Sequence, residues 1–409
     1  MNKETVITET SQKNIVCTGC SGRLQFVPGT NHLKCQSCGM ENEIEVCTGP
    51  IEKLNLEEYL DEFEKKSEFL EAATIKCQGC GAQTTLAPNI ISDFCPFCGS
   101  PQVVKNEGTT HGIKPQAILP FAVTLGNAYE NYQAWIKKLF FVPNKFRKYV
   151  QQEGKLTGVY IPSWIYDADV NSDYTAGQGE ESSDSSGSRN SENSVPSIDD
   201  GIEDTAYAQK IIALNEKMEA DIYTITDNGF SVSKVLRYKS SRTENPEFKG
   251  HVDDSYNDVL VIASKSLPKH YAEKLHPWFL KKLVPFNERY LPGFKTETYQ
   301  VGLKEGFADA KKKMNKRIEL AVNGAIGTKN RRIYSIITTY SNVTFKHILL
   351  PVWISAYRHK KKTYRILVNG STGTVKGERP FSWIKFVLFF TLIIAGFPGL
   401  MWLISIIVL

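Results

Sequence analysis

Two identical cysteine arrays near the start of the chain constrain its fold more than any other feature. Each has the pattern Cys-x2-Cys, fourteen residues, Cys-x2-Cys, and the arrays are offset by 60 residues. Four thiolates on two tight knuckles close around one tetrahedral zinc ion, at about 2.3 Å per sulfur. A ribbon of about 30 residues is too short to fold on its own core, so the metal supplies much of its folding energy. The predicted ligands are Cys17, Cys20, Cys35 and Cys38 in the first array and Cys77, Cys80, Cys95 and Cys98 in the second.

We therefore expect two structural zinc ions per chain. Iron is the alternative metal, because four-thiolate sites also suit iron, and redox-active cysteine pairs are a weaker one, because no thioredoxin-like βαβ context surrounds them. A catalytic zinc needs an open coordination position, which four cysteines do not leave. The ninth cysteine, Cys47, is expected to be an ordinary thiol, and His32 an ordinary surface histidine of the first ribbon.

The whole sequence predicts an α+β multidomain protein. Two rubredoxin-like zinc ribbons precede a mixed α+β domain and a C-terminal transmembrane helix. The expected units are residues 1–46 as the first ribbon, 47–74 as a helical connector, 75–106 as the second ribbon, 113–380 as the α+β domain and 386–409 as the membrane anchor.

Hydrophobic spacing predicts the secondary structure of the connector and the α+β domain. In the connector, apolar residues from Leu56 to Leu70 recur at helical spacing and predict a helix of about 18 residues. Asn127–Lys138 and Gly302–Asn323 are also expected to be helical, with Gly324 ending the second. Runs rich in β-branched and aromatic residues predict strands: Leu156–Val170, Val259–Ser264, Arg332–Tyr340, Ile348–Arg358 and Tyr364–Asn369, the last two joined as a hairpin.

A short internal repeat indicates that the α+β domain contains two related halves. The sequence Ile-Pro-Ser-Trp-Ile at 161–165 resembles Leu-Pro-Val-Trp-Ile at 350–354, and each opens a strand-like run. A likeness over five positions, three of them identical, also arises by chance, so duplication is a hypothesis.

Charge is unevenly distributed. The net charge is +5, but residues 177–206 contain eight acidic residues and one basic residue, so the rest of the chain is strongly basic. The acidic segment has almost no apolar side chains, and we expect it to be a disordered insert. Basic residues gather in Lys311–Arg317, Asn330–Arg332 and Arg358–Lys362. They form either solvated surfaces or a face attracted to anionic lipid.

The last 24 residues, 386–409, carry no charge. As a helix they extend about 36 Å, against a hydrocarbon core of about 30 Å. Lys376, Arg379 and Lys385 precede this run, so the flanking charge places the soluble domains in the cytoplasm. A single-pass protein of the cell membrane is expected. Pro398 with two neighbouring glycines permits a shallow hairpin as the alternative.

Catalytic and nucleotide-binding motifs are missing from the sequence. It has neither a P-loop nor a Rossmann fingerprint, and its histidines show no metal-ligand spacing. We expect a protein that is not an enzyme and has no small-molecule substrate. The ribbons lack clustered cations, so nucleic acid is an unlikely partner for them. A membrane-tethered nucleic-acid binder nevertheless remains the second hypothesis, and an enzyme whose site the sequence does not reveal the third.

Several segments together suggest a family. Leu119–Phe121, Gly158–Trp164, Asp258–Val261, Phe345–Trp353 and Leu367–Gly370 resemble bacterial TFIIB-type zinc-ribbon membrane proteins, the YdjG-like group. The likeness extends from about Cys77 to the tail, whereas the first ribbon and the acidic insert look additional. The resemblance implies a non-catalytic, membrane-anchored scaffold that recruits cytoplasmic proteins of PspA or SPFH type in envelope maintenance under membrane stress.

Overall fold

The computed structural model describes residues 15–45, 49–63, 70–77, 80–85, 92–98, 100–103, 108–144, 146, 156–178, 221–226, 229–239, 248–327, 331–359, 362–391 and 393. Cys47 lies outside them, as do residues 179–206 of the predicted insert and nearly all of the anchor beyond residue 391. Gly177 and Gln178, which the insert prediction included, instead end a strand.

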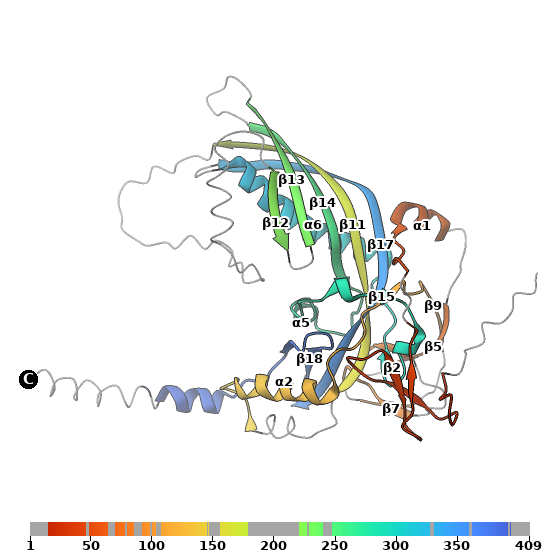
Figure 1. The fold of residues 1–409 in the computed structure, drawn as a ribbon. Coiled ribbons are helices and arrows are strands. Elements are labelled where there is room, and N and C mark those ends of the chain that lie inside the picture. The colour runs from red at the N-terminus through yellow and green to blue at the C-terminus, as the bar shows by residue number, and fades with distance from the viewer. Residues whose placement is uncertain are drawn as a thin grey trace, which may run out of the picture.

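A long, curved sheet of eleven strands organises the molecule (Figure 1). Its centre is an antiparallel ladder between β11 (Thr157–Gln178) and β17 (Arg331–His359). β14 (Phe248–Ile262) flanks β11, and β18 (Lys362–Asn369) forms the predicted hairpin with β17. The remaining strands of this sheet are β4 (Leu54–Asn55), β10 (Ala117–Ile118), β12 (Asp221–Thr226), β13 (Gly229–Lys239), β15 (Val284–Pro285), β16 (Lys295–Thr296) and β19 (Val375–Gly377).

Smaller elements surround the sheet. The strands of the first ribbon are β1 (Leu24–Phe26), β2 (His32–Cys35) and β3 (Glu41–Glu43); those of the second region are β5 (Leu70–Lys76), β6 (Gln83–Thr85), β7 (Ser92–Phe94), β8 (Pro101–Val103) and β9 (Gly108–Gly112). The helices are α1 (Leu56–Phe63), α2 (Leu125–Lys137), α5 (Lys269–Glu273) and α6 (Leu303–Ile326), with 3-10 turns η1 (Leu280–Lys282) and η2 (Glu288–Tyr290). Figure 1 places both ribbons at the same end of the sheet.

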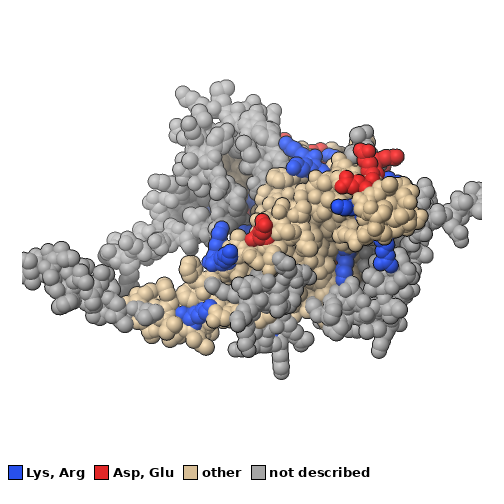
Figure 2. Space-filling view, turned by 60° about the horizontal axis from the view of Figure 1, so that its bottom comes forward, with Lys and Arg blue, Asp and Glu red and all other residues tan. Residues whose placement is uncertain are grey.

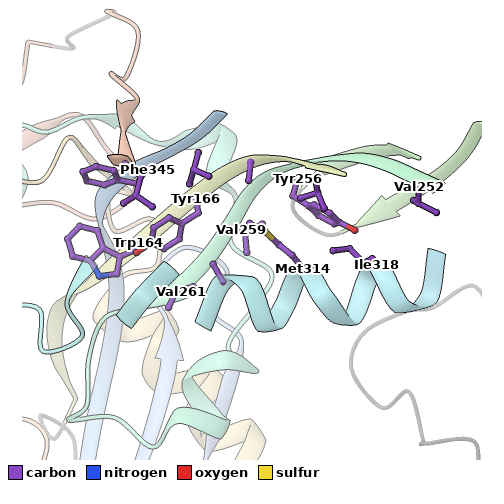
Figure 3. Packing of buried hydrophobic residues seen from close by; sticks show 14 of the residues in the cluster. Trp164, Tyr166, Val252, Tyr256, Val259, Val261, Met314, Ile318 and Phe345 are labelled. Carbon is purple, nitrogen blue, oxygen red and sulfur yellow. The ribbon is translucent and has the colours of Figure 1, made fainter. Parts of the chain in front are cut away.

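Helix α6 covers one face of the half of the sheet that lies farther from the ribbons, which we call the far half (Figures 1 and 3). Its buried side chains recur every three or four residues, as an amphipathic helix requires. Met314 and Ile318 face Val259 and Tyr256 of β14 in one hydrophobic cluster. Gly306 allows the close approach, because a Cβ there would lie 2.5 Å from the Tyr166 hydroxyl oxygen.

The ladder has an approximate two-fold symmetry that supports the predicted duplication. Ile161 lies directly opposite Leu350, the corresponding residue of the repeat. β10 runs parallel to β17, and β16 runs parallel to β11. In each half the helix, α2 or α6, begins seven residues after the short strand ends. Each half therefore places its short strand against the long strand of the other.

Three predictions of secondary structure were wrong. The connector helix is much shorter than 18 residues: α1 ends at Phe63, and Leu70 begins strand β5. Helix α6 continues past Gly324 and stops at Gly327, which adopts a φ of +52°. The two strands predicted on either side of residues 341–347 form one strand, β17, with a local irregularity near Asn342 (φ +51°).

Within the described residues, no helix has the length and apolar character needed to cross a bilayer. The predicted transmembrane helix begins in a helical segment, residues 383–391, which we call the tail helix; beyond it the prediction falls almost wholly outside the described residues.

Candidate metal centres

The structure brings all eight predicted ligands together in two separate clusters. In each, the four sulfur atoms lie within 4.8 Å of one another. In the first cluster Cys17 and Cys38 are 3.6 Å apart, and Cys20 and Cys35 are 3.5 Å apart. Sulfurs bound at about 2.3 Å to one tetrahedral ion are separated by about 3.8 Å. The four side chains thus have the spacing of a metal cage.

The second cluster has the same geometry. The sulfurs of Cys77 and Cys98 are 3.6 Å apart, as are those of Cys80 and Cys95. A disulfide would need a separation of about 2.05 Å, and all eight cysteines are free thiols. Each cluster can therefore hold one metal ion, and its four-sulfur donor set is the one that zinc and iron prefer.

Tight turns position the sulfurs. In three of the knuckles the residue after the second cysteine has a positive φ: Ser21 at +54°, Gly39 at +74° and Gly81 at +75°. Glycine adopts this conformation without strain. Gly22 has a different role, since a Cβ there would lie 3.1 Å from the sulfurs of both Cys20 and Cys35. It leaves room for the cage itself.

Hydrogen bonds within each cage favour the ionised form of some of its cysteines and the protonated form of others. Mainly because the Cys38 backbone amide hydrogen-bonds its sulfur, the pKa of Cys35 falls to about 6. The pKa of Cys80 falls to about 5, chiefly through a side-chain hydrogen bond from Cys95. The pKa of Cys20 instead rises to about 12, mainly through a side-chain hydrogen bond with Cys38, and the pKa of Cys95 also rises, mainly through its hydrogen bond with Cys80. Thiolates are the form that binds metals, so a metal ion would have to displace the protons that remain in each cage.

The first ribbon docks on the α+β domain through its apolar strands. Phe26 of β1 is fully buried and contacts Tyr290 edge-on, with ring centroids 5.2 Å apart. The Gly29 amide donates to the Phe121 carbonyl at 2.8 Å. Cys20 and Cys38 stay exposed, with Met40 beside them at 46% exposure. One face of this ribbon belongs to the core, and the opposite knuckles face solvent.

The second ribbon is buried more deeply against the α+β domain than the first. Phe97, between its last two cysteines, is completely buried, and its carbonyl accepts from Arg365 Nε at 2.6 Å. Thr84 forms an isolated bridge with Glu297, which follows β16. Both ribbons are therefore integral parts of the fold, a feature that cysteine spacing alone does not reveal.

Sequence reasoning missed Glu297, a carboxylate with only 1% of its surface exposed. Burial raises its pKa to about 8, although the nearby Ser264 and Ser266 hydroxyls favour the charged form slightly. Neither carboxylate oxygen has a partner with good hydrogen-bond geometry within the described part of the chain. Its counterpart in the other half of the duplication is the apolar Leu119, which lies in the same hydrophobic cluster as Phe97 of the second ribbon, so only one of the two equivalent positions carries an acid.

Other sequence candidates lie away from the clusters. His32 pairs with Glu41 at 3.5 Å and contributes to neither cage. The lysines of α6 have internal partners: Lys311 lies over the rings of Phe307 and Tyr340, and Lys313 donates to the Leu260 carbonyl. These contacts fit the expectation of an ordinary helix surface better than a free basic patch.

Comparison with known proteins yields one distant relative. The chain is 23% identical over 386 residues to "Uncharacterized protein YdjG" of Bacillus subtilis (strain 168), which covers 93% of this chain and 94% of the relative. No protein-family model matches the sequence. No solved structure matches it either. The similarity thus extends over most of the chain and must reach upstream of Cys77, where the sequence resemblance began.

Proposed function

We propose that this protein is a non-catalytic, zinc-dependent scaffold, held on the cytoplasmic face of the cell membrane by a single C-terminal span. The observation that carries the proposal is that two closed four-cysteine cages are built into one folded body, from which a helix with exposed apolar side chains emerges. Zinc is the metal of this proposal because four sulfurs make a closed tetrahedral site without an open catalytic position.

The tail supports the membrane part of the proposal. Trp383, Ile384 and Leu388 of the tail helix are 69%, 83% and 61% exposed, and the sequence continues uncharged to residue 409. Exposing such side chains to water is costly, whereas lipid accepts them. The span is proposed to be continuous, since a lipid-exposed turn at Pro398 would leave backbone groups unpaired.

The first ribbon supports the scaffold part. Its outer surface joins the exposed knuckles of Cys20 and Cys38 to Met40 and Val16, which are 46% and 45% exposed. Methionine adapts to different partner surfaces, so it suits a docking site. We assign partner binding to this surface, and from the resemblance we propose cytoplasmic proteins of PspA or SPFH type as partners.

Membrane fractionation tests the anchor. Deleting residues 386–409 should move the protein from the membrane to the soluble fraction, and any residual binding should weaken with salt. A truncated protein that still needs detergent for extraction would contradict the anchor.

Recovery of partners from native membranes, with nuclease treatment as a control, tests the scaffold. Met40→Ala and Val16→Ser should each reduce recovery of the proposed partner proteins while leaving the fold intact. Leu320→Ser is a matched control, because Leu320 is 53% exposed on α6, away from the ribbon. Nucleic acid recovered in place of protein would favour the tethered nucleic-acid binder.

A further inference from the structure

Most of the strongly exposed large apolar side chains among the described residues gather at one corner of the molecule. The corner is formed by the turn after α2 and by the start of the tail helix, and in Figure 2 it is the tan projection at the left, which shows blue atoms but no red ones. These side chains are Phe140, Phe381, Trp383, Ile384, Val387, Leu388, Phe389, Phe390 and Ile393.

The tail helix is fixed to the body at this corner. The Ser382 amide donates to the Phe141 carbonyl at 2.8 Å. Lys385 Nζ donates to the Val142 carbonyl at 2.8 Å and to Asn144 Oδ1 at 2.7 Å. The Phe141 ring packs against the rings of three tail residues, with centroid separations of 5.5–5.8 Å: Phe381, Phe386 and Phe389. The helix therefore leaves the body in a set direction.

Phe140 projects from the same turn. Its side chain is 79% exposed although its neighbours Leu139 and Val142 are buried, so the turn itself is anchored and the ring points outward. Lys137 and Lys138, just before it, are exposed. Moving a phenylalanine ring from water into an apolar medium is favourable, because the ring's apolar surface is removed from water.

We propose that the turn carrying Phe140 is a second membrane-contact element, with its ring inserted at the headgroup level of an anionic bilayer beside the tail helix. This inference rests on the proposed function, because it takes the tail to enter the membrane. Phe140 would then fix the orientation of the body on the lipid surface, which a tail alone would leave free to tilt.

Lipid fits this corner better than a protein partner does. The apolar surface is continuous with a sequence that stays uncharged for 24 residues, 386–409. Lysines at the edge of an aromatic surface are typical of membrane interfaces, where basic residues are attracted to anionic lipid. Glu378, the acidic residue that precedes the tail in the sequence, accepts a hydrogen bond from the Arg365 backbone amide at 3.2 Å.

Photo-crosslinking in the full-length protein tests the proposal. Benzoylphenylalanine replaces Phe140 in protein reconstituted into vesicles of phosphatidylethanolamine and phosphatidylglycerol. Ile384, in the tail helix, is the positive control, and Ile337, 69% exposed on β17 in the far half of the sheet, is the matched negative control. The probe at 140 replaces one exposed aromatic ring with another, so folding is preserved.

We expect lipid adducts at positions 140 and 384, each at least several-fold above position 337. Substituting Lys137 and Lys138 with Gln should lower the yield at 140 several-fold but leave that at 384 unchanged. Adducts at 384 alone, or a protein adduct at 140, would overturn the inference while leaving the anchor intact. Lipid adducts at neither position would instead refute the anchoring on which it rests.

Discussion

Trp164 and Trp353 make the same contact in the two halves of the α+β domain. The indole N–H of Trp164 donates to the Val301 carbonyl at 2.9 Å, and that of Trp353 donates to the Val123 carbonyl at 3.0 Å. Each acceptor lies two residues before α6 or α2 begins. Each indole also packs against an aromatic ring in the segment that joins the short strand to the helix. Trp164 packs against Tyr299 and Trp353 against Phe121, with ring centroids 5.1 and 5.0 Å apart. A tryptophan on each long strand thus holds the start of one helix.

This relationship predicts similar losses of stability from Trp164→Phe and Trp353→Phe. Each change leaves a carbonyl without its donor, which costs about 1–3 kcal/mol when the group is buried. Chemical denaturation of the detergent-solubilised chain measures both. Losses that differ by much more than this range would show that the two contacts are not equivalent.

Metal content should be two ions per chain, with zinc expected. Replacing Cys17 and Cys20 with Ser, or Cys77 and Cys80 with Ser, should leave one ion in each case, because each cage has its own four ligands. The second pair should destabilise the body more, since the Phe97 carbonyl of that ribbon accepts from Arg365 and its Cys80 and Cys98 are half-buried, whereas Cys20 and Cys38 of the first ribbon are exposed. Elemental analysis of chelator-free protein provides the count, and one ion or none in the unaltered chain would disprove the assignment.

Gly306→Ala should destabilise the protein by about 1–3 kcal/mol, because the added methyl group overpacks a tight helix–sheet contact. The Cβ would lie 2.5 Å from the Tyr166 hydroxyl oxygen and 2.7 Å from Trp164 Cδ1. Gly302→Ala is the matched control in the same helix region, since a Cβ there meets nothing within 4 Å. Equal effects of the two changes on the denaturation midpoint would argue against the close packing of α6.

Because the Glu297 carboxyl is buried, we predict that the free energy of unfolding falls as pH rises. The folded-state pKa of this carboxyl is about 8, above the ordinary value of 4.5. The unfolded chain therefore loses this proton first, and between these values the folded state holds more protons. Stability should decline across this window by up to about 1.4 kcal/mol per pH unit and level off above it.

Glu297→Gln should flatten this dependence, and Glu297→Leu, which introduces the residue found at position 119, should do the same. Denaturation between pH 6 and 8 makes the comparison. Parallel pH profiles for the variants and the unaltered chain would exclude Glu297 as the source.

The cysteine arrays were sufficient to predict the metal cages, because ligand spacing within a ribbon is a local property. Sequence also located α2 and α6 from their periodicity, and the β17–β18 hairpin from its β-branched and aromatic residues. The continuity of β17 was hidden, since Ser341 and Asn342 look like a break and only the pairing with β11 carries the strand through them. The burial of Glu297 likewise depends on the docking of a ribbon some 200 residues earlier in the chain, and no local pattern encodes such a contact.

The length of the β11–β17 ladder separates two parts of the chain that an anionic membrane would treat in opposite ways. β11 has 22 residues and ends at Gln178, where the acidic sequence begins. At about 3.3 Å per residue, a strand of this length extends about 70 Å along its path. The tail helix emerges at the other end of the sheet (Figure 1). The acidic sequence and the tail helix therefore join the body at opposite ends of a strand whose path is several Debye lengths long, so each can be altered without changing the local charge where the other is attached.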